Sequence, residues 1–148
     1  MLLEYGFGTR QENSPTYVPW TVLHYSGLNK RIVLIFLLLE NGFLPNEKAY
    51  NDDKTLSSIA AKTRQLEIAI LLLGNGAQVN TEGHFGTTPS KEAIYNNHHT
   101  MAQWVIENGA DVNFSGTREC SFKTPVQVAI SMGSQVALDL LLASGSSP

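Results

Sequence analysis

The sequence has few of the features that mark secreted, membrane-spanning or disulfide-bonded chains. Cys120 is its one cysteine, so no internal disulfide can form, which favours a reducing compartment. The longest apolar run, Ile32 to Leu39, is far shorter than the roughly 20 residues that a membrane-spanning helix needs. The first residues lack the basic and apolar regions of a signal peptide. We therefore expect no membrane contact and an intracellular location, in the cytoplasm or the nucleus.

Excess positive charge is also missing. The 148 residues include 10 Lys and Arg against 13 Asp and Glu, and the net charge is −3. Without a cluster of Lys and Arg, the chain lacks the electrostatic pattern of a nucleic-acid-binding protein. Hydrophobic residues make up 43% of the chain, an ordinary value for a globular protein. At roughly 150 residues per domain, we expect one domain and a monomer with no nucleic-acid partner.

The chain does contain an internal repeat. Glycines that each end a similar apolar segment lie 36, 34, 33 and 36 residues apart, at Gly6, Gly42, Gly76, Gly109 and Gly145. A threonine stands 21 residues before each of the last four glycines, at Thr21, Thr55, Thr88 and Thr124. The distance from each glycine to the next threonine varies. A segment of fixed length joined by variable segments predicts a packed unit connected by exposed loops.

The fixed segment predicts two short helices of about 9 and 10 residues. Threonine is a good helix N-cap, and proline follows it in Thr88-Pro89 and Thr124-Pro125, where a helix tolerates proline best. The second helix carries an apolar stripe, which in the second unit is Ile68, Ala69, Leu72 and Leu73. The glycine that follows suits the left-handed C′ position. Helices this short are unstable alone, so each must bury its stripe against neighbouring units.

These residues resemble the ankyrin repeat, whose pattern is Thr-Pro-Leu-His-x-Ala-Ala followed by Leu-Leu-x-x-Gly-Ala-Asp-Val-Asn. Thr21-Val22-Leu23-His24 and Ile59-Ala60-Ala61 match the first half, and Gly76-Ala77-Gln78-Val79-Asn80 and Gly109-Ala110-Asp111-Val112-Asn113 match the second. The resemblance implies an all-α fold, an α-solenoid of stacked helix-turn-helix repeats with hairpin-like loops. We expect one domain over 1–148, with a partial repeat at 1–15 and repeats at about 16–48, 49–82, 83–115 and 116–148.

The chain departs from the ankyrin pattern at several positions. Ser57 and Ser90 stand where the family buries leucine, and a buried serine without a partner costs about 1–3 kcal/mol. Among the signature histidines only His24 is kept, and the glycine between the two helices is kept only as Gly133. These departures predict lower stability rather than a different fold. Neither end has an obvious polar capping repeat, which suggests a fragment of a longer array.

No pattern in the sequence favours catalysis or a cofactor. His98 and His99 are adjacent on an expected helix and diverge, so we interpret them as surface residues rather than metal ligands. Cys120 has Arg118 and Lys123 nearby but no histidine within 20 residues, which favours a loop thiol without a catalytic role. Asp52 and Asp53 are neighbours in an expected turn. We predict no enzyme activity, no cofactor and no metal.

The resemblance implies a protein partner, met by the loops before each threonine and by residues near the end of each first helix. Extra length between Gly109 and Thr124 adds a cation-and-aromatic loop to these positions. The predicted contact residues are Tyr17, Trp20, Asn51, Asp52, Lys54, Lys62, His84, Phe85, Tyr95, Asn96, Arg118, Phe122, Lys123 and Met132. The expected function is protein recognition or scaffolding. The alternative is a regulatory or spacer segment of a larger multidomain protein that carries the catalytic domain.

Overall fold

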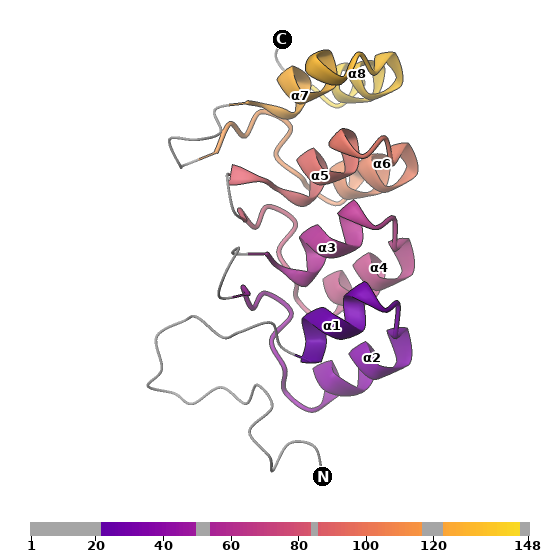
Figure 1. Ribbon diagram of the computed structural model, residues 1–148. Helices are drawn as coiled ribbons and strands as arrows, with labels where there is room; N and C mark the ends of the chain where they lie inside the picture. The colour runs from indigo at the N-terminus through magenta and orange to yellow at the C-terminus, as the bar shows by residue number, and fades with distance from the viewer. Residues whose placement is uncertain (1–21, 50–53, 84–85, 117–122, 146–148) are drawn as a thin grey trace.

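The computed structural model describes residues 22–49, 54–83, 86–116 and 123–145, which contain eight α-helices and no strand. The helices form four consecutive pairs: α1 (Val22–Leu28) with α2 (Ile32–Glu40), α3 (Leu56–Lys62) with α4 (Leu66–Gly74), α5 (Pro89–Tyr95) with α6 (His99–Glu107), and α7 (Pro125–Met132) with α8 (Gln135–Ala143). The first helices stack on one another in one row and the second helices lie in a second row (Figure 1). The predicted all-α fold of stacked helix pairs is confirmed.

The recurring threonines begin the first helices, as their spacing predicts. The hydroxyl oxygen of Thr55 accepts a hydrogen bond from the Ser58 amide at 3.3 Å, and the Ser58 hydroxyl oxygen accepts one from the Thr55 amide at 3.2 Å. Thr124 and Gln127 form the same reciprocal pair. Each pair satisfies two backbone donors that a helix start otherwise leaves without a partner. Thr21 lies outside the described residues.

The recurring glycines follow the second helices with a left-handed backbone. Gly42, Gly76, Gly109 and Gly145 have φ angles of +92°, +88°, +95° and +84°. The amide after the glycine then donates back to the helix, as in the 2.9 Å bond from the Ala77 amide to the Leu72 carbonyl oxygen. Because a side chain is strained at such φ angles, these positions favour glycine. This prediction from the sequence is also confirmed.

The helices are shorter than the expected 9 and 10 residues, because the turn between them takes more of the unit. The first helices have seven or eight residues and the second helices nine. One residue in each turn is left-handed: Lys30 at φ +55°, Arg64 at +60°, Asn97 at +56° and Gly133 at +65°. Only the fourth pair has glycine at this position, so the other three turns carry backbone strain.

We expect the substitution Arg64→Gly to stabilise the protein. The left-handed conformation costs an ordinary residue roughly 1–2 kcal/mol, and glycine removes this cost while adding flexibility to the unfolded chain. The net gain in the free energy of unfolding should be about 0.5–1 kcal/mol, measured by urea titration. Asn97→Gly is the control and should gain less, because asparagine tolerates this conformation. A lower free energy of unfolding in Arg64→Gly would contradict the claim that the backbone at Arg64 is strained.

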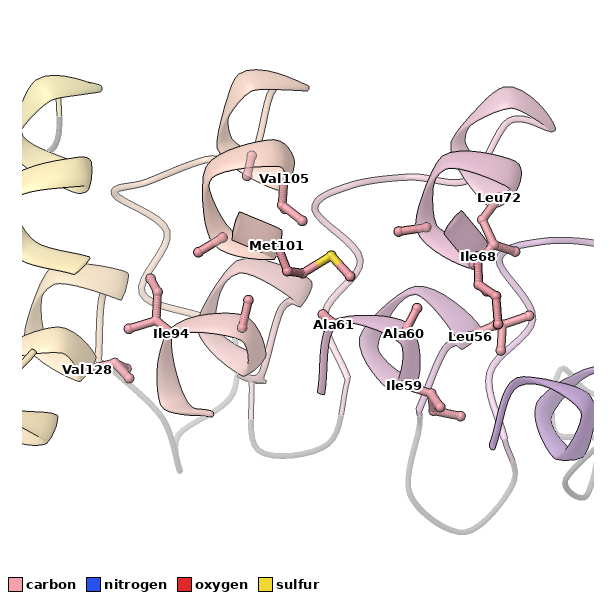
Figure 2. Packing of buried hydrophobic residues seen from close by; sticks show 14 of the residues in the cluster. Leu56, Ile59, Ala60, Ala61, Ile68, Leu72, Ile94, Met101, Val105 and Val128 are labelled. Atoms are coloured by element: carbon pink, nitrogen blue, oxygen red, sulfur yellow. The ribbon is translucent and has the colours of Figure 1, made fainter. Parts of the chain in front are cut away.

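One apolar core runs through all four helix pairs. Buried aliphatic residues from both helices of each pair form a single cluster, which includes Leu23, Leu56, Leu72, Ile94 and Leu141. Figure 2 shows Met101 of α6 directed toward the α3–α4 pair, so that the core continues from one pair into the next. Each pair is therefore stabilised mainly by its neighbours.

The serine at a usual leucine position in α5 is not an unsatisfied buried group. Ser90 is buried, but its hydroxyl oxygen lies 3.0 Å from that of Thr88, and either group can donate. Ser57 at the same position in α3 is only half-buried. The predicted penalty for a buried serine without a partner is therefore wrong for Ser90, because the helix N-cap supplies the partner.

Candidate functional site

The exposed surface of the first-helix row is the candidate site, because it offers large side chains at equivalent places. One equivalent position in the last turn is exposed in all four first helices: Leu28 in α1, Lys62 in α3, Tyr95 in α5 and Ser131 in α7. The Tyr95 side chain is 61% exposed. Because α1 packs on α3, α3 on α5 and α5 on α7, these positions follow one another along the stack. They form a continuous strip, which we call the first-helix face.

The structure describes six of the residues that the sequence predicts as contacts. Lys62, Tyr95, Lys123 and Met132 are exposed, whereas Lys54 and Asn96 are half-buried. Of these, Lys62, Tyr95 and Met132 end α3, α5 and α7. The other eight predicted residues lie outside the described part of the chain: Tyr17, Trp20, Asn51, Asp52, His84, Phe85, Arg118 and Phe122. The assignment of all fourteen as contacts remains a prediction.

A charged group joins α3 to α5 on this face. The Glu92 carboxylate in α5 interacts electrostatically with Lys62 and Lys54. Burial raises the pKa of Glu92, and the two lysines and a hydrogen bond from Asn96 oppose that rise. The Asn96 side-chain nitrogen donates to a Glu92 carboxylate oxygen at 3.4 Å and to the Glu92 carbonyl oxygen at 2.7 Å. Glu92 is not among the contact residues predicted from the sequence.

The loops between pairs are closed at their bases by backbone hydrogen bonds. The Ala49 amide donates to the Lys54 carbonyl oxygen at 2.9 Å, and the Gly83 amide donates to the Thr87 carbonyl oxygen at 2.7 Å. The buried His24 lies beneath the first of these loops, with Nε2 3.2 Å from the carbonyl oxygens of both Glu47 and Lys54. Since carbonyl oxygens only accept, Nε2 carries the proton and donates. The loop bases are thus held in hairpin-like form.

Lys91 occupies the signature histidine position of the third pair. It bonds to a loop through its ammonium group, whereas His24 uses its ring. Its side chain is buried, and Nζ donates to the Gly86 carbonyl oxygen at 3.0 Å. The ammonium also lies 5.3 Å from the centre of the Phe114 ring, a cation–π distance. Burial lowers the pKa of Lys91, and the charge of Glu82 opposes this. Lys91 therefore fixes the fold locally and is not available to a partner.

Asparagine side chains connect successive pairs, a role that the sequence analysis missed. Asn46 donates to the Gly76 carbonyl oxygen at 3.2 Å, and its side-chain oxygen accepts from the Gln78 amide at 2.7 Å. Asn80 makes the equivalent bonds to Gly109 and Asp111 at 3.1 and 2.7 Å. Asn46 and Asn80 each stand four residues after a recurring glycine, and this recurrence was the available signal. The bonds fix one pair relative to the next and so make the first-helix face rigid.

The adjacent histidines are only partly exposed, so the expectation that both are surface residues is wrong in part. Both are half-buried. His98 is the N-cap residue of α6, and its Nδ1 lies 3.0 Å from the Ala61 carbonyl oxygen of the preceding pair. His98 thus bonds across the pair interface, while His99 begins α6 with a buried Nδ1 that has no hydrogen-bond partner within the described ranges. Those ranges contain no group of three or more metal-ligand side chains.

The geometry of the described residues provides a rigid strip with polar, cationic and aromatic groups. Within these residues, none of the helices has the length and apolar character needed to cross a membrane. The structure presents side chains from several stacked units to one side, which is how solenoid proteins bind extended surfaces of other molecules. The class of protein that this fold defines is a repeat protein built from helix pairs.

The chain belongs to the ankyrin repeat family. The family model for ankyrin repeats, in 3 copies, matches residues 57–148. A fowlpox virus (strain NVSL) protein, itself described as an ankyrin repeat protein, is 30% identical over 111 residues, which are 74% of this chain and 33% of that relative. The matched region thus spans a third of the relative's length. Ankyrin repeats are generally protein–protein interaction modules and are typically non-enzymatic.

Proposed function

We propose that this chain recognises a partner protein through the first-helix face and the adjoining loops, and that it catalyses no reaction. The observation that carries the proposal is the row of exposed side chains at the ends of the first helices, especially Tyr95 and Lys62. Tyrosine is enriched among the residues that contribute most to binding at protein interfaces. The asparagine bonds between pairs support rigid display, which lowers the entropic cost of binding.

The row of second helices is the alternative surface for contact with a partner. Val33 and Phe36 of α2 and Ile70 of α4 are exposed apolar side chains on the second helices. This apolar group is interrupted along the stack, because Gln103 and Asp139 stand at the position of Ile70 in α6 and α8, and exposed apolar side chains recur only in α8, at Val136 and Leu142. The first-helix face, by contrast, carries large exposed residues on the successive helices α1, α3 and α5. We therefore favour the first-helix face as the partner contact.

We expect Tyr95→Ala to reduce capture of a partner protein, and Ile70→Ala to leave it unchanged. An exposed aromatic anchor contributes on the order of 1–3 kcal/mol to binding, which corresponds to a loss of about fivefold or more. Partners would be captured on the immobilised protein, identified by mass spectrometry and measured again with each variant, after circular dichroism has shown equal helicity. If Ile70→Ala abolished capture while Tyr95→Ala did not, the contact would lie on the second helices and the proposal would be wrong.

A further inference from the structure

Charge is separated between the two helix rows. The described second helices carry Glu40, Glu67, Glu107 and Asp139 and contain no lysine or arginine. The described first helices, with the two residues before α3, α5 and α7 and the turn after each first helix, carry the cations Lys30, Arg31, Lys54, Lys62, Arg64, Lys91 and Lys123. Glu92 is the one acid in that second set. Among the described helices and their flanking residues, the first-helix row is therefore mainly basic and the second-helix row acidic.

Four of the five exposed cations in this set lie in the first two pairs, and the fifth, Lys123, precedes α7. Lys30 and Arg31 lie in the turn after α1, while Lys62 ends α3 and Arg64 lies in the turn after it. All four side chains are exposed. Lys30 and Arg64 share the left-handed position of their turns, so they occupy equivalent places in packed neighbouring pairs. The turn after α5 has the uncharged Asn97 at this position.

Apolar and aromatic side chains are also exposed on the first helices of this part of the stack. Tyr25 and Leu28 of α1 are 55% and 44% exposed, and Tyr95 of α5 is also exposed. A surface of this composition complements an acidic segment that also carries apolar side chains. The apolar contacts supply most of the affinity and the charges supply orientation and selectivity.

We propose that the first-helix face over α1, α3 and α5 binds an extended acidic segment of a partner protein. This inference rests on the proposed function and names the chemistry of the partner. Packed helices lie about 8–10 Å apart, and an extended chain in the polyproline II conformation has three residues per turn and advances about 3.1 Å per residue. Carboxylates of the partner segment that are about three residues apart would therefore contact cations of successive pairs. Apolar residues of the same segment would pack against Leu28 and Tyr95.

A nucleic acid fits this surface less well. Polyanion binding requires many phosphate contacts along a basic track, whereas the exposed cations of the first-helix face lie mainly in the first two pairs. The acidic residues of the second helices would also repel a long polyanion. A short acidic segment needs only a few cations and uses the aromatic side chains between them.

A substitution of Glu92 tests whether charge on the first-helix face contributes to binding. Its carboxylate interacts with Lys62 and Lys54 and so competes with a carboxylate of the partner. Glu92→Gln removes the competing charge, and binding of an acidic segment should become about two to three times tighter, the effect of one partly exposed charge pair. A surface that ignored charge would not respond in this way.

The experiment selects peptides from a phage-displayed random library on the immobilised protein. We expect the enriched peptides to combine Asp or Glu about three residues apart with apolar residues. For one such synthetic peptide, Lys62→Glu should weaken the measured affinity by about tenfold, since it removes an attraction and adds a repulsion. Thr100→Glu on α6 is the control. This substitution lowers the net charge at an exposed position of α6 that is equivalent to Glu67 in α4. It should change the affinity less than about twofold.

Several outcomes would overturn the proposal: enrichment of neutral or basic peptides, no enrichment, or equal weakening by Thr100→Glu and Lys62→Glu. Tighter binding of oligothymidylate than of the peptide would also overturn it, in favour of a polyanion. Lys62→Gln, which adds no repulsion, should weaken binding by a few fold and guards against misfolding of Lys62→Glu. If these tests failed while partner capture still depended on Tyr95, the proposed function would stand and only the acidic chemistry would be wrong.

Discussion

Leu72→Ala should destabilise the protein more than any other single truncation discussed above. Leu72 lies in α4, is only 1% exposed, and packs in the core between neighbouring helix pairs. Removing a buried leucine side chain costs about 2–5 kcal/mol, because transfer energy is lost and a cavity remains. In a solenoid this loss weakens the contacts on both sides of the second pair. The free energy of unfolding from urea titration measures the effect.

Leu142→Ala is the matched control for that prediction. Leu142 lies one position further along its second helix, in α8, but its side chain is 51% exposed. Its truncation should cost less than about 1 kcal/mol. Equal losses in the two variants would mean that the core does not pass through the second pair as described.

His24→Leu should also cause a large loss, of about 1–3 kcal/mol. The buried His24 ring donates to two loop carbonyl oxygens, and leucine removes this donor without changing the apolar packing much. The loop base closed by the Ala49–Lys54 hydrogen bond should then exchange its amide protons faster. Urea titration gives the loss in stability, and hydrogen exchange locates it.

His99→Leu is the control for His24→Leu, because it shows the effect of a histidine-to-leucine substitution where no hydrogen bond to a described residue is lost. His99 has a buried Nδ1 without a hydrogen-bond partner among the described residues, so leucine removes a buried polar atom there. This variant should be as stable as the original protein or more stable. A comparable loss in both variants would contradict the bonding role of His24.

Much of the fold could be predicted because its signals are local in the sequence. A threonine cap such as Thr88 and a left-handed glycine such as Gly76 each depend on a few neighbouring residues. The spacing between them then fixes the helix pair. The apolar stripe of Ile68, Ala69 and Leu72 is also buried as its period predicts.

The features that the sequence analysis missed depend on contacts between units. The bond from His98 to Ala61 joins residues far apart in the chain, and Asn46 reaches across to the next pair. The left-handed turns at Lys30 and Arg64 were missed because glycine was the only signal considered. The packing of successive pairs imposes the strained backbone at these turns, and a local sequence pattern does not reveal this strain.

The candidate site was predictable only in part, for the same reason. Lys62 and Tyr95 follow from the ankyrin resemblance, whereas the partnership of Glu92 with Lys62 and Lys54 requires that α3 and α5 pack together. The overall charge gave no sign of a basic side. That separation appears only when first and second helices are assigned to different rows.

The most direct test of the account is a map of backbone amide shifts by nuclear magnetic resonance during titration with the enriched acidic peptide. We expect the largest shifts at the exposed ends of α1, α3 and α5, around Leu28, Lys62 and Tyr95. The amides of the second helices should shift little. Shifts centred on Phe36 and Ile70 would place the contact on the second-helix row and contradict the account.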